Sequence, residues 1–393
     1  MSQTDFLKRA SSVASYYGFM PLEIALEKYS ATGNYKKTEP VVQKSHDCFS
    51  EEMSTLVEHS LTLNVARMNR PLQLYHVRTE SGKSARNSGK ARIRFGLTVF
   101  GIEQSIAEAL ILSSALAILN EVGVKEASVH INSVGDRDSM QRFTRELNTY
   151  FRKNLAIMPA TCREALKRDI LDAHEFLLER KHPLLEGAPQ PMQFLSDAHR
   201  RHLKEVLEFL ESSEIPYEID GELTGARDYY SQTMFEIKET GGDDAENVVP
   251  VTHIARGGRC DDLFKRFHKA HVPTVSIIIE KLLETARVPA WKPPRVRRPR
   301  IYFVQLGSRA KLLSLSVTEA LRKAHIPLQQ AIGSNSLTEQ LEEARSLSIP
   351  RAIIMGQREA LDGTVIVRDL NTHAQTVLPV GDLSEYLKSS MIL

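Results

Sequence analysis

Hydrophobic side chains recur at helical and strand spacing along the first part of the chain. Residues 4–18 carry apolar side chains on one helical face, which predicts an amphipathic helix that ends at Gly18. Residues 19–26 predict a strand. Residues 51–59 predict a helix within a weakly patterned region.

Two apolar runs, residues 72–77 and 93–100, flank the polar segment SGKSARNSGKAR. They predict two antiparallel strands joined by a long tip rich in basic residues, glycine and serine. Such a tip can fold over a phosphate or remain an ordinary surface loop, and both interpretations stay open. Its basic residues, which are candidate RNA contacts, are Lys83, Arg86, Lys90 and Arg92.

The middle of the chain combines strong helices with short strands. Residues 102–122 predict a helix that ends at Gly123, and residues 137–212 predict helices interrupted at prolines. Residues 275–279 predict the start of a helix that closes the first domain near residue 288. Short strands are predicted at residues 127–132, 217–219 and 254–259.

The stretch LTGARDYYSQTMFE, residues 223–236, alternates like a strand. Tyr229, Thr233 and Phe235 fall on one face of this pattern, whereas Tyr230 and Met234 fall on the other. A glycine shortly before the tyrosines allows a close approach of the backbone. The pattern fits a strand that faces a pocket, and it also fits an ordinary core strand with two tyrosines.

The C-terminal part has a different pattern, which begins after a linker at residues 289–300. The linker, PAWKPPRVRRPR, is stiffened by proline and is basic, so it could contact RNA phosphate or remain a solvated linker. Residues 301–389 then alternate as βαβαββα. This order predicts a small α/β domain whose parallel strands are covered by helices on both faces.

Composition places the chain among ordinary globular proteins. Its 393 residues are 42% hydrophobic and 25% charged, and the net charge of +2 neither favours nor excludes nucleic acid. The three cysteines, Cys48, Cys162 and Cys260, are widely spaced, which excludes a disulfide framework and a cysteine zinc site. We find no apolar signal region and no run of 18 apolar residues, so we expect a cytoplasmic protein outside membranes.

Two histidine pairs have spacings that could share a helix face. They are His199 with His202, and His268 with His271. Neither pair has a third ligand at metal spacing, so we expect solvated histidines and no metal site.

Several segments resemble histidyl-tRNA synthetase, in the same order and at similar spacings. They are HINSVGD, LEFLESSEIPYEI, GARDYYSQTMFE, RGGRCDDL and GTVIVRDL, and the resemblance covers about residues 5–390. It implies an α+β fold, in which a class II synthetase-like antiparallel sheet core with flanking helices precedes a small α/β anticodon-binding-like domain. We assign residues 1–288 to the core, 289–300 to the linker and 301–393 to the anticodon-binding-like domain. The family resemblance and the apolar helix at residues 106–119 predict a homodimer.

The resemblance also assigns the cations that such an enzyme uses on ATP. Synthetases of this class hold the α-phosphate between arginines and magnesium, so their catalysis rests on positioning and electrostatics. The second class motif places Arg78 at phosphate and Glu80 on the adenine side. The family's catalytic arginine corresponds to Gly225, and Arg227 shares its predicted strand face. The third motif's arginine corresponds to Lys281, which keeps the charge but loses the planar fork.

The amino-acid pocket implied by the resemblance has lost several polar groups. Thr98 stands where the family has a glutamate for the substrate's amino group, and Arg94 aligns with the glutamine that reads the imidazole. Cys260 replaces a pocket tyrosine. The family's threonine-leucine-arginine-proline-glutamate-glycine segment has no counterpart before Leu72. The residues predicted to line the pocket are Thr98, Asp228, Tyr229, Tyr230, Gly257, Gly258 and Arg259.

RNA binding by the C-terminal domain is weakened in this sequence. Many relatives have a lysine pair at the start of the second helix of this domain, whereas this chain has the acidic residues Glu339, Glu342 and Glu343. Negative charge opposes contact with RNA phosphate. The predicted RNA contacts in the linker are Arg295, Arg297, Arg298 and Arg300.

The losses predict a synthetase-like protein that is impaired or inactive in aminoacylation and acts by binding. Such a protein could sense RNA or histidine, or could serve a regulated enzyme partner, as the synthetase-like regulatory subunit of ATP phosphoribosyltransferase does. That subunit usually lacks the C-terminal domain that this chain retains. The alternative is an active divergent histidine–tRNA ligase, in which Arg227 and Lys281 supply the missing cations. No structural cofactor is expected, and ATP and magnesium are required only under this alternative.

Overall fold

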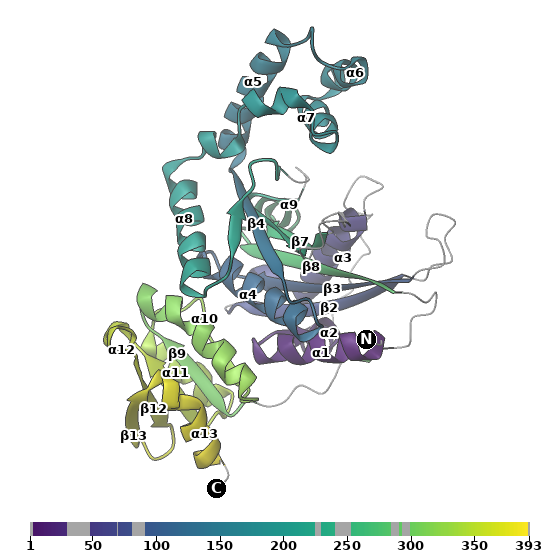
Figure 1. Ribbon diagram of the computed structural model, residues 1–393. Helices are drawn as coiled ribbons and strands as arrows, with labels where there is room; N and C mark the ends of the chain where they lie inside the picture. Colours follow the sequence, from purple (N-terminus) through teal and green to yellow (C-terminus); the bar gives the residue numbers. More distant parts are fainter. Residues whose placement is uncertain are drawn as a thin grey trace.

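Two β-sheets organise the chain, one of eight strands and one of five (Figure 1). The computed structural model describes residues 3–29, 48–68, 70–80, 91–224, 229–239, 253–283, 291–292 and 299–391. Helices flank both sheets, so the α+β fold predicted from the sequence is confirmed. The domain limits at residues 288 and 300 stay predictions.

The larger sheet is mainly antiparallel and has the strand order β1-β2-β3-β8-β7-β6-β4-β5. Only the outer pairs, β1 with β2 and β4 with β5, are parallel. The strands are β1 Met20–Pro21, β2 Leu72–Glu80, β3 Ala91–Phe100, β4 Ala127–Gly135, β5 Tyr217–Ile219, β6 Gln232–Glu239, β7 His253–Arg259 and β8 Thr274–Leu283.

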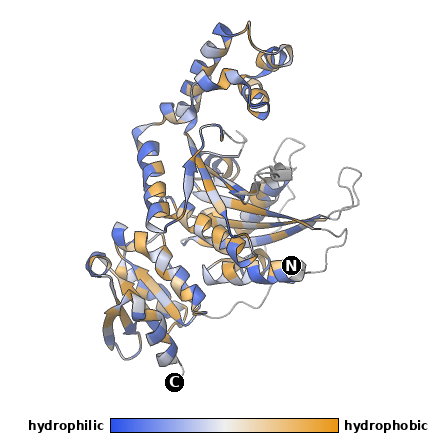
Figure 2. Ribbon diagram, in the orientation of Figure 1, coloured by the Kyte–Doolittle hydropathy of each residue, from blue (hydrophilic) through white to orange (hydrophobic). Residues whose placement is uncertain are grey.

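Helices cover both faces of this sheet. One face packs against α1 (Gln3–Tyr16), α4 (Ile106–Glu121) and α8 (Asp197–Ser212). The other face packs against α2 (Leu22–Tyr29), α3 (Cys48–Leu63) and α9 (Asp261–His268). Figure 2 shows apolar residues concentrated on the strands and on α4 between these layers.

A helical insertion follows β4 and lies at the upper end of the molecule in Figure 1. Its helices are α5 Arg137–Lys153, α6 Ala160–Arg168 and α7 Ile170–Glu179, followed by the 3-10 turns η2 Pro183–Gly187 and η3 Pro191–Phe194. They enclose a separate apolar core that includes Phe143, Phe151 and Leu177. The predicted helices and their proline interruptions between residues 137 and 212 are therefore confirmed.

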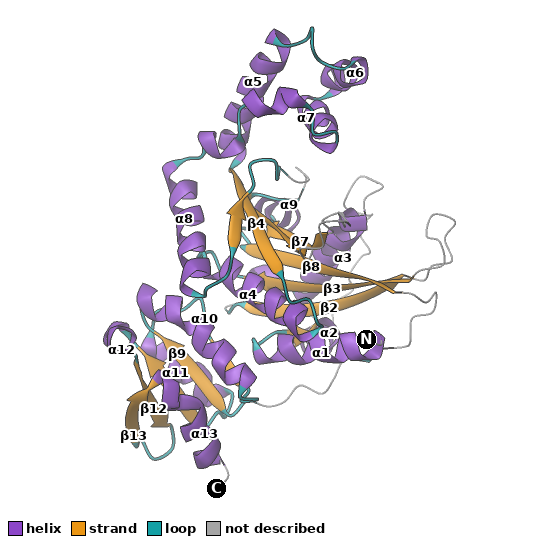
Figure 3. Cartoon of the chain, in the orientation of Figure 1, coloured by secondary structure: helices purple, strands orange, loops and turns teal. Residues whose placement is uncertain are grey.

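The smaller sheet has the order β10-β9-β11-β12-β13, in which β9 pairs in parallel with both β10 and β11. Its strands are β9 Ile301–Gln305, β10 Leu328–Gln330, β11 Arg351–Met355, β12 Thr364–Asp369 and β13 Gln375–Pro379. Its helices are α10 Ser308–Lys323, α11 Leu337–Ser346, α12 Gln357–Asp362 and α13 Leu383–Met391, with the 3-10 turn η4 Val380–Asp382 before α13 (Figure 3). The prediction missed α12 and β13, and it expected parallel strands where β12 and β13 are antiparallel.

Helix α10 joins the two sheets, because it contacts α1, α4 and α8 of the larger unit. The hydroxyl of Tyr17 donates to Glu319 of α10 at 2.8 Å. Glu319 also accepts from Arg322, whose guanidinium lies 3.5 Å from Glu121. Burial, together with the nearby charge of Glu319, raises the pKa of Tyr17, so its hydroxyl stays a donor.

The Tyr17→Phe variant tests this connection. Loss of a buried hydrogen bond to a carboxylate is expected to lower the free energy of unfolding by about 1–2 kcal/mol. Chemical denaturation measures the change, and Tyr16→Phe is the control because Tyr16 is half-buried beside it. Equal losses in the two variants would show that the bond between Tyr17 and Glu319 contributes nothing of its own.

Helix α4 begins at Ile106 and is almost entirely buried within a single chain. The sheet, α1, α8 and α10 together cover its apolar side chains. Because folding of one chain already covers it, this helix gives no support of its own to the predicted homodimer. The homodimer itself stays a prediction that rests on the family resemblance.

Three predicted elements are wrong. Residues 19–26 form only β1 before α2 begins, where Leu22 and Ala25 are buried at helical spacing. Residues 275–279 lie in β8, a strand buried between β3 and β7, and strands with neighbours on both sides read as continuous apolar runs. The strand predicted from residue 223 begins at Gln232, whose φ of 67° breaks the extended backbone.

Candidate functional site

The strand register gathers charged side chains on the sheet face below α3. Arg78 of β2 pairs with Arg94 of β3, and Arg94 pairs with Glu280 of β8. Directly paired residues of antiparallel strands point to the same face. Glu80 and Arg92 are paired one step further along the same face. We call Arg78, Glu80, Arg92, Arg94 and Glu280, with Glu52 of α3, the charged face.

Each arginine of the charged face contacts carboxylates of the chain itself. Arg94, with a side chain only 3% exposed, donates to Glu80 at 2.6 Å and to Glu280 at 3.2 Å. Arg78 lies 2.7 Å from Glu51 and 3.6 Å from Glu52. Arg78 and Glu80 are the residues predicted to contact ATP, and in the structure Glu80 accepts from Arg94 instead.

Glu52 is the site residue that sequence reasoning missed. It is buried on α3, accepts from Arg94 at 3.4 Å and lies 3.3 Å from His76 Nε2. Burial alone would raise its pKa, but the hydrogen bond with His76 and the charges of Arg78 and Arg94 outweigh burial, so the pKa is lowered. The pair Glu51-Glu52 lies before Leu72 in the chain. No counterpart of the family's glutamate-bearing segment was predicted in that part of the sequence.

Gly96 makes room for this arrangement. A Cβ at Gly96 would meet the His76 ring, so His76 lies directly over the backbone of β3. His76 pairs with Gly96 in the register and thereby reaches Glu52. This position of the sheet therefore depends on a residue without a side chain.

The structure places Lys281 away from Arg78, and it engages the Thr98 hydroxyl within the sheet. Lys281 pairs with Ile93, so its side chain lies on the opposite face of the sheet, and the residue beside Arg94 is the acid Glu280. This register does not bring Lys281 to the predicted phosphate position. Thr98 is fully buried and its hydroxyl lies 3.1 Å from Ser276 Oγ, so both hydroxyls are already engaged inside the sheet.

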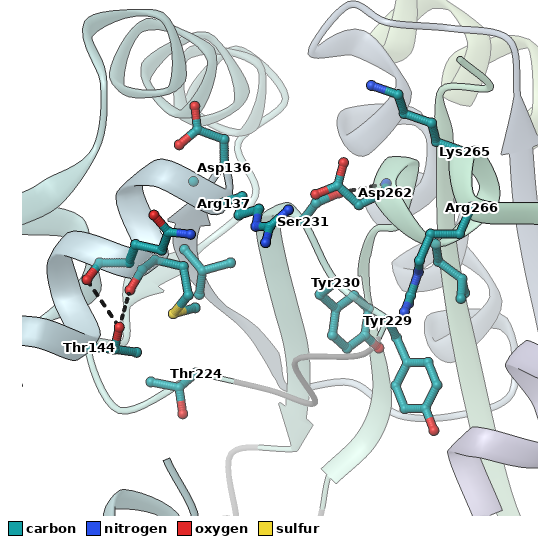
Figure 4. Close-up of a pocket in the computed structure, with 15 residues that line it drawn as sticks. Asp136, Arg137, Thr144, Thr224, Tyr229, Tyr230, Ser231, Asp262, Lys265 and Arg266 are labelled. Carbon is teal, nitrogen blue, oxygen red and sulfur yellow. Dashed lines mark hydrogen bonds between the residues drawn. The ribbon is translucent and has the colours of Figure 1, made fainter. Parts of the chain in front are cut away.

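A cavity of about 740 Å³ opens between the insertion, α9 and the segment before β6. Figure 4 shows Asp136, Arg137 and Thr144 on one side and Lys265 and Arg266 on the other, with the tyrosines between them. A volume of this size is typical of small-molecule pockets. Its lining residues are Val134, Gly135, Asp136, Arg137, Met140, Gln141, Thr144, Thr224, Tyr229, Tyr230, Ser231, Asp262, Leu263, Lys265 and Arg266.

The two tyrosines line this cavity from a loop. Tyr229 and Tyr230 are both buried, and Gly258 lets the Tyr230 ring approach, since a Cβ at Gly258 would lie 2.7 Å from that ring. Gly225, Arg227 and Asp228 lie outside the described residues. The predicted strand face is thus replaced by a loop that carries both aromatic rings into the cavity.

Arg259 and Gly257 were predicted to line the pocket, but they lie on the opposite face of the sheet. Both pair on the sheet face that α4 covers, where Arg259 is fully buried. Arg259 donates to both oxygens of Glu108, at 2.8 and 2.7 Å, and lies 3.5 Å from Asp261. Glu108 is buried too. Desolvation would raise its pKa, but the charge of Arg259 and the hydrogen bond of His202 outweigh desolvation and lower the pKa to about 2.

The expectation of solvated histidines is wrong for His202. Its Nε2 lies 2.7 Å from Glu108, and only 15% of its side chain is exposed. Thr233 donates to the same carboxylate at 2.8 Å. The buried cluster of Glu108, Arg259, His202 and Thr233 therefore links α4, β7, α8 and β6, and it lies apart from the large cavity.

The predicted RNA contacts are only partly visible. Arg300 is exposed, whereas Arg295, Arg297 and Arg298 lie outside the described residues. Among the acids of α11, Glu342 is exposed and Glu343 accepts from Tyr302 at 2.8 Å. Glu339 accepts from Ser334 at 2.9 Å near the start of the same helix.

Within the described ranges, no group of three histidine, cysteine or acidic side chains could hold a metal ion. Over the same residues, no helix is long and apolar enough to cross a membrane.

The acids of the charged face contact arginines. These carboxylates could bind magnesium only if their contacts with the arginines were broken.

Comparisons with known proteins agree with this architecture. The family described as "Anticodon binding domain" matches residues 301–390. The histidine–tRNA ligase of Geobacillus kaustophilus is 25% identical over 399 residues, which cover 96% of this chain and 92% of the relative. That of Bacillus subtilis is 26% identical over 324 residues, which cover 81% and 76%.

Solved structures give weaker likenesses. Apo histidyl-tRNA synthetase of S. aureus is 18% identical with a TM-score of 0.49, and the alignment covers 97% of this chain and 94% of that one. An ATP phosphoribosyltransferase regulatory subunit/histidyl-tRNA synthetase from Bacillus halodurans C is 15% identical with a TM-score of 0.43, covering 91% and 97%.

Proposed function

Because this chain belongs to the histidyl-tRNA synthetase family, we propose that it is a member impaired in aminoacylation that acts by binding. The binding role is regulatory, and its ligand occupies the 740 Å³ cavity that Tyr229 and Tyr230 line. Tyrosine rings with nearby Arg137 and Asp262 suit a small polar ligand, such as histidine or an exposed base of RNA.

The charged face is the observation that supports this proposal. Phosphoryl and adenylyl chemistry needs unshielded cations aimed at the developing negative charge. Here Glu280 stands beside Arg94, and Glu51 and Glu52 stand beside Arg78. Each carboxylate reduces the field that a phosphate would experience, and a phosphate placed there would meet negative charge at close range. The site is therefore poorly suited to ATP.

One observation favours the alternative, an active divergent histidine–tRNA ligase. Helix α3 supplies to the charged face the buried carboxylate of Glu52, which was not among the residues predicted from the sequence. A carboxylate whose pKa is lowered stays ionised and could pair with the ammonium of an amino acid. In that case Arg78 would have to leave Glu51 and Glu52 to reach phosphate.

Histidine-dependent exchange between ATP and pyrophosphate tests the proposal. We expect exchange at least about 10³-fold below that of the Bacillus subtilis histidine–tRNA ligase, because loss of one such electrostatic group already costs about 10²–10³-fold. The Gly225→Arg variant is expected to stay at the same level, since Glu280 and Thr98 remain. Robust exchange that Arg78→Ala abolishes would establish the active ligase instead.

A further inference from the structure

The turn between α5 and α6 exposes three consecutive apolar residues, Leu155, Ala156 and Ile157, which we call the apical turn. Leu155 and Ile157 are 39% and 61% exposed. Isolated apolar residues are common on protein surfaces, but a run of three exposed apolar residues usually has a function. Among the other large apolar residues that the structure describes as exposed, none lies as close in sequence to another.

The fold holds the apical turn away from the core. Phe151 at the end of α5 and Met158 after the turn are both buried in the separate core of the insertion. Between them the backbone N–H of Ile157 donates to the carbonyl of Asn154 at 3.2 Å, and that of Met158 donates to the carbonyl of Leu155 at 3.4 Å. The connection from α5 to α6 lies at the upper end of the molecule in Figure 1. The exposed apolar side chains therefore belong to an ordered turn that projects from the molecule.

Basic residues flank the apical turn on both sides. Arg152 and Lys153 precede it in the last turn of α5, Arg163 follows it in α6, and all three are exposed. No acidic residue occurs between Glu146 and Glu164, although the whole chain has 51 basic and 49 acidic residues. The apical turn thus lies in a local positive field that the small net charge of the chain does not reveal.

An aliphatic turn between cations complements the surface of an anionic lipid bilayer. Aliphatic side chains enter the boundary between headgroups and acyl chains, and neighbouring lysine and arginine side chains attract anionic headgroups.

Two other partners fit the apical turn less well. Proteins that bind single-stranded RNA stack the bases on aromatic side chains, and the three exposed residues of the turn include none. The same turn of a second copy would bring like charges together. The observations therefore favour a lipid surface.

We infer that the apical turn docks this protein reversibly on anionic lipid bilayers. Leu155 and Ile157 enter the headgroup boundary, and Arg152, Lys153 and Arg163 contact anionic headgroups. The contact stays at the bilayer surface, because three apolar residues are far too few to span it.

This docking departs from the expectation of a protein outside membranes. That expectation rested on the lack of a long apolar run, and surface contact needs no such run. The 740 Å³ cavity stays clear of the bilayer, because its wall residue Thr144 lies roughly 14 Å along α5 from Lys153, at about 1.5 Å per residue. The inference is thus independent of the ligand in that cavity and of the exchange assay.

Co-sedimentation of the full chain with lipid vesicles tests the inference. One preparation is phosphatidylcholine alone, and the other is phosphatidylcholine mixed with phosphatidylglycerol. We expect binding to the mixed vesicles only, and weaker binding as salt is added. The double variant Leu155→Ser with Ile157→Ser is expected to bind about tenfold more weakly or worse, and Lys153→Gln about fivefold more weakly. These variants should fold, because the replaced side chains are exposed and lie outside the core of the insertion.

Leu361→Ser and Lys204→Gln are the matched controls. Leu361 is 62% exposed on α12, the Lys204 side chain is 77% exposed on α8, and both variants are expected to bind vesicles like the wild type. The inference is overturned if the chain does not bind the mixed vesicles, if the double variant binds them like the wild type, or if Leu361→Ser weakens binding equally. A single-stranded RNA that binds the double variant and the wild type alike, but Lys153→Gln more weakly, would assign the turn to RNA if vesicles are not bound. None of these results bears on the proposed function.

Discussion

Replacement of Glu108 by glutamine is expected to lower the free energy of unfolding by about 3–5 kcal/mol. Glu108 is the carboxylate that holds the buried guanidinium of Arg259, with two contacts of 2.8 and 2.7 Å. Glutamine keeps an acceptor but removes the charge, so Arg259 would remain buried with Asp261 as its only nearby anion among the described residues. An unbalanced buried cation is one of the few causes of so large an effect.

The same carboxylate predicts how stability depends on pH. The pKa of Glu108 is lowered from 4.5 to about 2 in the folded chain, so folding favours its ionised form. Its contribution is therefore complete above the unfolded pKa and is lost as the pH falls from there toward about 2. A shift of this size corresponds to roughly 3 kcal/mol, so the wild-type protein should lose stability in this range more steeply than the Glu108→Gln variant.

Chemical denaturation at neutral and acidic pH measures both effects. Glu103→Gln is the control, because the Glu103 side chain is 75% exposed and lies near the start of the same helix. It should change the free energy of unfolding by less than about 0.5 kcal/mol. If Glu108→Gln behaved like this control, the buried cluster would not be a main contributor to the stability of the larger sheet.

The Gly257→Ala substitution is expected to destabilise the chain by about 3 kcal/mol or more. A Cβ at Gly257 would lie 2.3 Å from the Ser276 carbonyl oxygen and 2.8 Å from Ile277 Cα, which are backbone atoms of β8. Backbone in the middle of a sheet cannot move aside without breaking its ladder. Gly257 is thus required for packing within the sheet.

Gly381→Ala provides the comparison for this variant, since a Cβ at Gly381 would meet no atom within 4 Å. Thermal and chemical unfolding of the two variants should differ strongly, with Gly381→Ala close to the wild type. Equal stability of Gly257→Ala and the wild type would mean that β7 and β8 can separate locally, contrary to their regular register.

The sheet has two faces with different tasks. The face below α4 holds Arg259 with Glu108 and is a structural centre. The face below α3 holds Arg78, Arg94 and their acids, which contact one another. A residue's role in this protein therefore depends on which face its strand position gives it, and one residue along a strand changes the face.

Much of the fold was predictable because its elements carry local signals. The hairpin of β2 and β3, the helix at α4 and the alternation after residue 300 are strong periodic patterns bounded by glycine and proline. The prediction failed where the local signal was ambiguous. The run VSIII has no period and fits a buried strand as well as a helix, and only its neighbours β3 and β7 make it a strand.

The candidate site was less predictable for a related reason. Motifs indicated that Arg78, Glu80, Tyr229 and Tyr230 matter, and the structure places the tyrosines at one cavity and the charges elsewhere on the same face of the sheet. Nothing in the sequence signals that Glu52, 26 positions before Arg78, would be buried beside it. Helix α3 brings it there through packing between Met53, Leu56 and the sheet.

Residue order and periodicity alone established the family resemblance, the α+β class, the main helices and the absence of the expected arginine at position 225. These features depend on short stretches of sequence or on motifs, so they can be recognised from the order of residues alone. The tertiary structure decided which charges meet: Glu280 with Arg94, Glu108 with Arg259, and Gln330 with Gln305. Such pairs depend on strand register and helix docking, which are set by burial of the whole core and not by any single segment.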